Sequence, residues 1–145
     1  MAISQAICNT FKAELLQGIH DFDPGADVFK LALYTSAANL GAPTTAYTTG
    51  GEVVATSGTY TAGGNTLTVT ATFPKLDGSV AMVTFGNTVW PSVTLTARGA
   101  LLYNSSKSNR AIAVFDFGAD KTATNGDFTI LFPAPSAATA VLRLT

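Results

Sequence analysis

The chain has 145 residues, which is enough for one domain with a core of its own. Charged residues make up 12% of it, about half the share of roughly 25% that is usual in soluble domains. The net charge is −1 without a cluster of lysine or arginine, and no apolar run reaches the ~18 residues of a membrane span. We therefore expect neither nucleic acid nor a membrane as a partner.

Threonine fills most of the polar positions, with 22 threonines against 8 lysines and arginines. Its β-branched, polar side chain suits the hydrated face of a pleated sheet. A surface with so few charges is poorly protected against association. We expect partner proteins to cover much of it.

The N-terminal segment 3–17 is predicted to form an α-helix. Apolar residues recur in it at every fourth position, which places them on one helix face: Ile3, Ile7, Phe11, Leu15 and then Ile19. Ser4 is the expected N-cap, and Gly18 is the expected residue just past the C-terminal end. This apolar face either packs on a sheet or contacts a partner.

The remainder of the chain, about 27–145, has the character of β-structure. Short apolar or alternating runs predict strands, at 28–35, 66–73, 79–85, 88–97, 100–104, 111–117, 127–132 and 140–144, with a weaker candidate at 52–56. Turn sequences separate them: Gly63-Gly64-Asn65, Asp77-Gly78, Asn104-Ser105-Ser106 and Asn125-Gly126. Pro91 indicates a sheet edge or a bulge beside Trp90.

This pattern predicts a mainly β fold. Many short strands joined by hairpin turns are typical of an antiparallel β-sandwich or jelly-roll-like domain. No repeat or linker divides the sequence. We expect a single domain over 1–145, with the N-terminal helix added to the sandwich.

The sequence lacks the parts that nucleophilic catalysis needs. His20 is the only histidine, and no Gly-x-Ser-x-Gly elbow is present. A catalytic pair of Cys8 and His20 is conceivable, but Cys8 falls within the expected helix without an oxyanion-hole motif nearby. We interpret Cys8 as a buried thiol and expect no catalytic residues.

A second candidate for chemistry is the acidic stretch "DFDPGAD" at residues 21–27. Asp21, Asp23 and Asp27 begin like a calcium-binding loop, but Gly25-Ala26 stand where an acidic or amide residue and a glycine are needed. The twelfth position, Ala32, is not a glutamate. We expect a turn between helix and strand here, and neither a metal nor a cofactor in the protein.

The stretch "VFDFGADKT" at residues 114–122 contains the Asp-Phe-Gly triplet of protein kinases. No glycine-rich nucleotide loop or His-Arg-Asp triplet accompanies it. We interpret the triplet as the end of a central strand, followed by a loop over 119–125. Asp116 is expected to cap that turn or to meet Arg98 or Lys121.

One cysteine permits no internal disulfide, and the N-terminus lacks the basic and apolar regions of a secretory signal. The threonine-rich, charge-poor body nevertheless resembles proteins that work outside cells. A virion protein, made in the host cytoplasm and later exposed by lysis, reconciles the two.

Several segments together resemble a family of small structural proteins of tailed bacteriophages, the head decoration or cement proteins. They are the N-terminal "MAISQAICNTFKAELL", "FKLALYTS" (29–36), "YTAGGNTLT" (60–68), "LTARGALLYN" (95–104), "RAIAVFDFGADKT" (110–122) and "GDFTILFP" (126–133). The resemblance covers nearly the whole chain in the same order.

This resemblance implies a non-enzymatic β-domain that binds the major capsid protein on the capsid exterior and stabilises the DNA-filled head. It also implies a homo-oligomer, with a dimer favoured over a trimer. The expected contact regions are the N-terminal helix, loop 44–51 and loop 105–110. The candidate contact residues are Ile3, Ile7, Phe11, Tyr47, Trp90, Lys107 and Arg110.

The alternative is a tail or fibre component that binds carbohydrate of the host surface. Sugar sites combine an exposed aromatic ring with polar groups, and only Trp90, Tyr47 and Tyr60 offer such rings. Packing of Trp90 into the core or an interface is the favoured interpretation.

Overall fold

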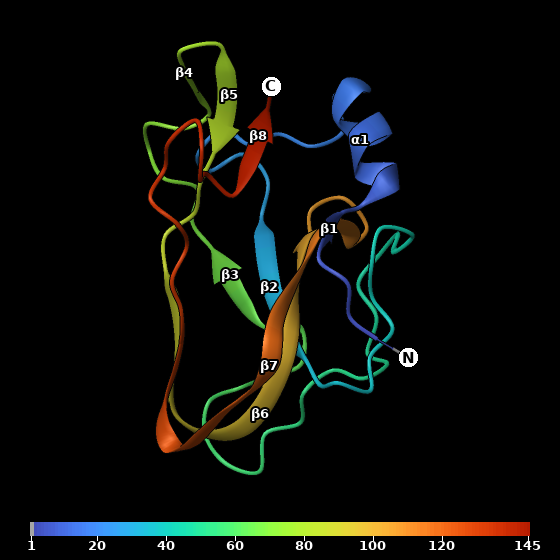
Figure 1. Ribbon diagram of the computed structural model, residues 1–145, viewed down its shortest axis with the longest axis vertical. Helices are drawn as coiled ribbons and strands as arrows, with labels where there is room; N and C mark the ends of the chain where they lie inside the picture. Colours follow the sequence, from blue (N-terminus) through green and yellow to red (C-terminus); the bar gives the residue numbers. More distant parts are fainter. Residues whose placement is uncertain (1) are drawn as a thin grey trace.

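The computed structural model describes residues 2–145, which form two antiparallel β-sheets and one short helix (Figure 1). The five-stranded sheet has the order β1-β7-β6-β2-β3 and the three-stranded sheet the order β4-β5-β8. The strands are β1 (Ala6–Ile7), β2 (Phe29–Tyr34), β3 (Asn65–Leu67), β4 (Lys75–Asp77), β5 (Val80–Val83), β6 (Thr88–Asn104), β7 (Arg110–Ile130) and β8 (Leu142–Leu144). The prediction of a mainly β, antiparallel sandwich with an N-terminal helix is confirmed.

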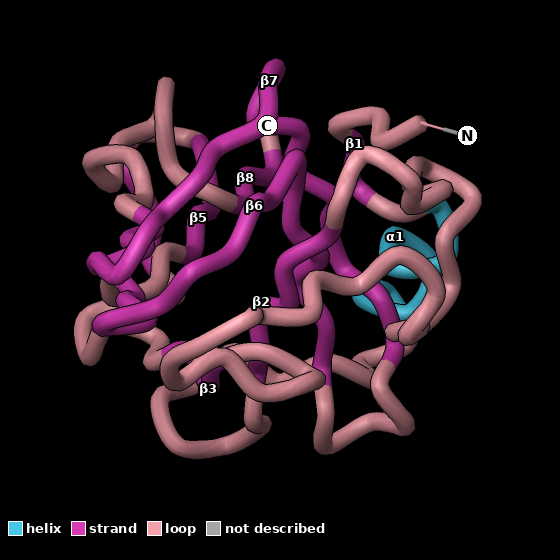
Figure 2. The backbone as a smooth tube through the Cα atoms, turned by 90° about the horizontal axis from the view of Figure 1, so that it is seen from below, coloured by secondary structure: helices cyan, strands magenta, loops and turns pink. Residues whose placement is uncertain are grey.

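The central feature is the long hairpin of β6 and β7, whose strands run side by side in the view from below (Figure 2). The turn after Asn104 joins them, as the Asn104-Ser105-Ser106 sequence predicts. Four shifts of register interrupt the pairing, one of them between Trp90 and Val93. Each bulge adds local twist, and the hairpin curves round the bottom of the molecule (Figure 1). The bulge expected at Pro91 is therefore confirmed.

The same hairpin corrects two predictions. The runs 88–97 and 100–104 are parts of one strand, β6, and the run 111–117 and residues 127–130 of the run 127–132 are parts of β7. The loop predicted at 119–125 is wrong because the chain stays paired there, with Ala97 opposite Lys121 and Leu95 opposite Ala123. Gly118 and Asn125 take positive φ values of 78° and 47° inside the strand, so they form bulges rather than a strand end and a hairpin turn.

The N-terminal helix is shorter than predicted. Helix α1 spans Asn9–Leu16, whereas Ala6–Ile7 form strand β1 at the edge of the large sheet. A four-residue apolar spacing fits an extended segment as well as a helix, and β7 offers a free edge that pairs with Ala6 and Ile7. Ser4 is therefore not the N-cap; Cys8 takes that position without a side-chain cap. Gly18 follows the helix with φ 71°, as predicted.

The run 66–73 also forms less strand than its alternation suggests. Strand β3 ends at Leu67, and Val69 keeps only an isolated bridge to Phe85. The amide of Phe73 donates to the carbonyl of Thr70, so the chain turns there toward the small sheet. Leu67, Val69 and Phe73 are nevertheless buried, so the apolar face remains on the core side.

Strand β2 is covered on both faces, as its apolar sequence predicts, and five of its six residues are buried. Aromatic rings connect this core to the upper end of the molecule: Phe22 stacks on Phe29 at 4.6 Å between ring centroids, and Phe29 meets Phe85 edge-on at 5.7 Å. The small sheet and α1 both lie at this upper end (Figure 1). Within residues 2–145, the helical part is too short to cross a membrane.

Candidate functional site

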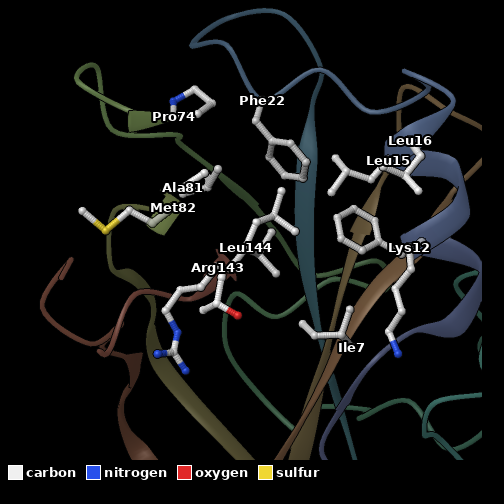
Figure 3. A pocket seen from close by; sticks show the side chains of 14 residues that line it. Ile7, Lys12, Leu15, Leu16, Phe22, Pro74, Ala81, Met82, Arg143 and Leu144 are labelled. Carbon is white, nitrogen blue, oxygen red and sulfur yellow. The ribbon is translucent and has the colours of Figure 1, made fainter. Parts of the chain in front are cut away.

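An apolar groove opens between α1 and the small sheet (Figure 3). Its volume is about 540 Å³, and apolar side chains form most of its lining. The residues of this groove are Ile7, Phe11, Lys12, Leu15, Leu16, Phe22, Pro74, Ala81, Met82, Val83, Leu142, Arg143, Leu144 and Thr145. We call it the α1–β8 groove, and it is the candidate site for binding.

The local sequence explains why α1 forms one wall of the groove. Phe11 and Glu14 face inward and are buried, whereas Lys12 and Leu16 face outward. Leu16 is 90% exposed, although burying a leucine contributes about 2 kcal/mol in a typical core. Gly18 then ends the helix and lets the chain turn back toward Phe22.

The floor of the groove and part of its opposite wall consist of buried side chains. Phe11 and Phe22 meet edge to face at 6.1 Å between ring centroids, and both rings are buried. Met82 of β5 and Leu142 of β8 are 2% and 7% exposed. Leu144, in contrast, is 59% exposed at the rim, facing Leu16 across the opening (Figure 3).

The charged side chains that line the groove are both positive. Lys12 comes from α1 and Arg143 from β8, and no aspartate or glutamate belongs to the lining. The Arg143 guanidinium donates to the carbonyl of Ala137 at 3.0 Å, and neither cation forms a salt bridge within residues 2–145. The groove is therefore apolar inside and cationic at its edge.

The structure brings two of the predicted contact residues into the groove. Ile7 and Phe11 line it, with Ile7 36% exposed and Phe11 buried. Ile3 lies elsewhere: it is buried, forms a bridge with Leu40, and packs where a side chain at Gly99 would collide with it.

Lys107 and Arg110, two further predicted contacts, belong to a polar network behind α1. Arg110 donates to one oxygen of Glu14 at 2.8 Å, and His20 Nε2 lies 2.8 Å from the other. Asn104 bridges His20 Nδ1 and Asp27, and Lys107 lies 3.6 Å from the Asp27 carboxylate. Arg110 thus ties the start of β7 to the helix, and Lys107 ties the 105–109 turn to Asp27.

The network explains the acidic turn at residues 21–27. The carboxylate of Asp21 accepts from the amide of Asp23, and that of Asp27 accepts from the amide of Asp21. Burial alone raises the Asp27 pKa, but the hydrogen bonds from Asp21 and Asn104 and the charge of Lys107 outweigh it and hold the pKa below its ordinary value. Within residues 2–145, no group of three or more His, Cys, Asp or Glu side chains is placed to hold a metal.

The Cys8 and His20 side chains are both buried, but they are not arranged as a nucleophile and its base. Both ring nitrogens of His20 have partners, Glu14 and Asn104. Burial, with the nearby Glu14 charge, raises the pKa of the Cys8 thiol to about 11, so the thiol is protonated at neutral pH. The interpretation of Cys8 as a buried thiol is confirmed, although it stands before α1 and not inside it.

The aromatic rings considered as sugar platforms belong to a second cluster, around Glu52, in which Trp90 is buried and Tyr47 and Tyr60 are partly buried. Its carboxylate accepts from the hydroxyls of Tyr47 at 2.6 Å and Tyr60 at 2.8 Å, and from the amide of Gly63 at 2.7 Å. Tyr60 also packs against Trp90, which is only 1% exposed. Burial and the Glu52 charge raise the pKa of Tyr103, stacked on Tyr47, to about 12. The favoured interpretation, that Trp90 packs inside, is confirmed.

The Asp-Phe-Gly triplet proves to be a bulge within β7. The Asp116 carboxylate accepts from the amide of Gly118 at 2.9 Å and from Arg98 Nε at 3.0 Å. The expected pairing of Asp116 with Arg98 is confirmed, whereas the turn that Asp116 was expected to cap is a bulge within β7. These two hydrogen bonds hold the Asp116 pKa below its ordinary value.

Sequence reasoning missed most of the groove. Its walls come from segments that are far apart in the chain, such as Lys12–Leu16 and Leu142–Leu144. One signal was present: Leu16 stands off the apolar face of the helix, next to Leu15, just before Gly18. An extra leucine on the outward face of a short helix indicates a surface that a partner can cover.

Comparison with known proteins adds no relative. No protein-family model, no curated protein and no solved structure matches this chain.

Proposed function

We propose that the protein is a bacteriophage capsid decoration protein that binds the assembled shell of major capsid protein and stabilises it. The observation that carries the proposal is the apolar upper end of the molecule. The α1–β8 groove and its exposed leucines stand on a domain with 12% charged residues. The resemblance of the sequence segments to decoration proteins supports the same role.

A decoration protein needs a surface that binds the assembled shell, and it needs no catalytic site. A protein that binds only the assembled shell shifts the assembly equilibrium by mass action, and many copies add their effects. Binding of this kind uses broad, weakly charged and shape-complementary surfaces. Exposed apolar residues, with Leu16, Leu76 and Leu144 all at the upper end, provide one such surface.

The alternative, a tail or fibre component that binds carbohydrate, needs an exposed aromatic ring. Trp90 is buried, and the hydroxyls of Tyr47 and Tyr60 are bound to Glu52. Trp90 is thus not available to a sugar, and Tyr47 and Tyr60 are partly buried with their hydroxyls already paired. The geometry favours the decoration role.

The test is to add the purified protein to bare, expanded capsids of the phage that encodes it. We expect saturable, stoichiometric binding and a higher melting temperature of the capsids. The variant Leu16→Gln with Leu144→Gln is expected to bind at least tenfold more weakly, because it removes two exposed apolar contacts. Leu131→Gln, a change of a 72% exposed leucine outside the groove, is the matched control.

Two results contradict the proposal. One is absence of the protein from purified virions by mass spectrometry. The other is immunogold labelling of the tail alone.

A further inference from the structure

We propose that the α1–β8 groove and the free edge of β8 together bind an extended peptide segment of a partner protein, apolar on one face and carrying a carboxylate. The segment adds as a fourth strand to the small sheet. The inference rests on the proposed function only in that it assigns the segment to the major capsid protein; the groove and the strand edge are observations of this chain.

The first argument is the free strand edge. The small sheet ends at β8, which pairs with β5 on one side and with no described strand on the other. Figure 1 shows β8 on the side of the small sheet that faces α1. The same three residues, Leu142–Leu144, also line the groove. A segment lying in the groove therefore runs beside unpaired backbone groups, which is the geometry of strand addition.

The second argument is the shape of the apolar lining. Phe11 and Phe22 are the buried aromatic rings of the lining. Leu16 of α1 and Leu144 of β8 are its exposed leucines (Figure 3). An added strand points alternate side chains downward onto the floor of the groove. A single alkyl chain in the groove leaves Leu16, which is 90% exposed, in water.

The third argument is charge. Lys12 and Arg143 are the charged residues of the lining, and neither has a carboxylate partner among residues 2–145. An acidic group on the segment can form salt bridges with these two cations. Charge complementarity of this kind fixes the register of the bound segment and excludes wrong partners. The segment is therefore acidic as well as apolar.

Charge also argues against a second copy of this chain in the groove. A twofold contact of this face with itself brings the same patch onto the same patch. Lys12 and Arg143 of one copy would then stand close to their equivalents in the other, without an aspartate or glutamate side chain in the lining to separate them. Repulsion of like charges disfavours that arrangement.

The test uses three blocked synthetic peptides of about nine residues. The first alternates valine with threonine and glutamate, the second replaces glutamate by lysine, and the third is the first with two prolines at alternate positions. Titration into isotopically labelled protein is followed by NMR. We expect the glutamate peptide to shift the amide signals of α1 and Leu142–Leu144 and to bind at least tenfold more tightly than the other two, because lysine reverses the charge and proline removes strand hydrogen bonds.

Charge reversal provides the matched variants. Lys12→Glu is expected to lower the preference for the glutamate peptide at least tenfold, because Lys12 is an exposed groove cation. Lys121→Glu, at an exposed lysine of β7 outside the groove, is expected to leave it unchanged.

Several outcomes overturn the inference. They are equal affinity for the glutamate and lysine peptides, undiminished binding of the proline peptide, shifts centred elsewhere, and no binding at about 1 mM. Tighter binding of dodecanoate at the same residues assigns the groove to an amphiphile instead. A dimer in sedimentation that Leu16→Gln dissociates assigns it to a second copy.

A second experiment separates this inference from the proposed function. A photo-crosslinking residue is placed at Leu16 or, as control, at Leu131, both exposed, and the protein is bound to capsids. We expect only the Leu16 probe to crosslink, to one apolar acidic segment of the capsid protein. Capsid binding with equal crosslinking at both positions refutes the docking site alone. No capsid binding refutes the proposed function. In that case the peptide titration still tests whether the groove binds an acidic, extended peptide.

Discussion

Glu14 is a buried carboxylate whose charge is used inside the protein, in contacts with His20 and Arg110. It lies on the inward face of α1, and its side chain is 9% exposed. Burial alone raises its pKa, but the hydrogen bonds and charges of His20 and Arg110 outweigh that effect and hold the pKa below the ordinary value. Glu14 thereby fastens the helix to the turn that joins β6 and β7.

Glu14→Gln is expected to lower the free energy of unfolding at pH 7 by about 2 kcal/mol, since it removes the charge from two hydrogen bonds. A lowered pKa stabilises the fold above the unfolded-state value of about 4.5, and that stabilisation is lost as the pH falls through the folded value. The difference between the two proteins should therefore shrink at pH 3.5. Urea denaturation at both pH values measures it.

Asp120→Asn is the control for this experiment, because Asp120 is an exposed carboxylate without a hydrogen-bonded side-chain partner in residues 2–145. It should change stability little at either pH. A Glu14→Gln deficit that stays constant down to pH 3.5 would show that packing, and not charge, is what the substitution removes.

At the scale of elements, the β6–β7 hairpin determines the architecture. Its bulges let one pair of strands of 17 and 21 residues serve both as the middle of the large sheet and as the curved lower end of the molecule. Gly99 lies at one of these register shifts, where a Cβ atom would stand 2.4 Å from the carbonyl oxygen of Phe115. Close backbone approach at this point requires glycine.

Gly99→Ala is expected to destabilise the protein by about 2 kcal/mol, because the added methyl group must push β6 and β7 apart against buried neighbours. Gly126→Ala, on the same hairpin, meets its nearest atom at 3.6 Å and should change stability by less than about 0.5 kcal/mol. Chemical denaturation of the two variants measures the effect. Equal stability of both would contradict the role assigned to Gly99.

The hairpin also shows what sequence can and cannot reveal at this scale. Apolar patterning predicted the class of fold and the strands that bury at least one side chain, because residue type reflects burial on one face. It missed β4, whose three residues are all exposed, and the run 52–56 forms only a bridge at Glu52. It could not show that residues 119–125 stay paired, since they are polar and exposed apart from Ala123. The start of the helix was predicted wrongly because the spacing of Ile3 and Ile7 is compatible with both a helix and an extended strand. Pairing with the free edge of β7 favours the strand, and the sequence does not show that edge.

The whole molecule divides into a well-buried large sheet and a lightly buried small one. Strand β2 is almost wholly buried, whereas all three residues of β4 and two of the three in β8 are exposed. Aromatic contacts from Phe29 through Phe85 to Phe132 join the two regions. The end that bears the proposed docking groove is thus also the less stable end.

Hydrogen exchange should show this division. Amides of Lys75–Asp77 and Leu142–Leu144 are expected to exchange at least tenfold faster than those of Phe29–Tyr34, because a small, exposed sheet opens without global unfolding. Mass spectrometry of exchanged, digested protein measures the rates. Uniform protection across both sheets would contradict it.

The groove forms only when distant segments of the chain come together in the folded molecule, which is why the sequence did not reveal it. Ile7 and Phe11 were among the predicted contacts and do line it, but the opposite wall comes from two distant segments of the chain, 74–83 and 142–145. The other predicted contacts, among them Trp90 and Arg110, have partners inside the molecule. Residue type alone does not distinguish an aromatic or cationic side chain that is used internally from one left for a partner.

The burial of Cys8 has a consequence for how the protein withstands oxidation. Its thiol is fully buried, and its raised pKa leaves almost no thiolate at neutral pH. Oxidants and disulfides attack the thiolate, and only where they can reach it. The folded chain, whose only cysteine this is, therefore neither needs a reducing environment nor forms covalent dimers in air. The Cys8 thiol should therefore keep its oxidation state in a reducing and in an oxidising medium alike.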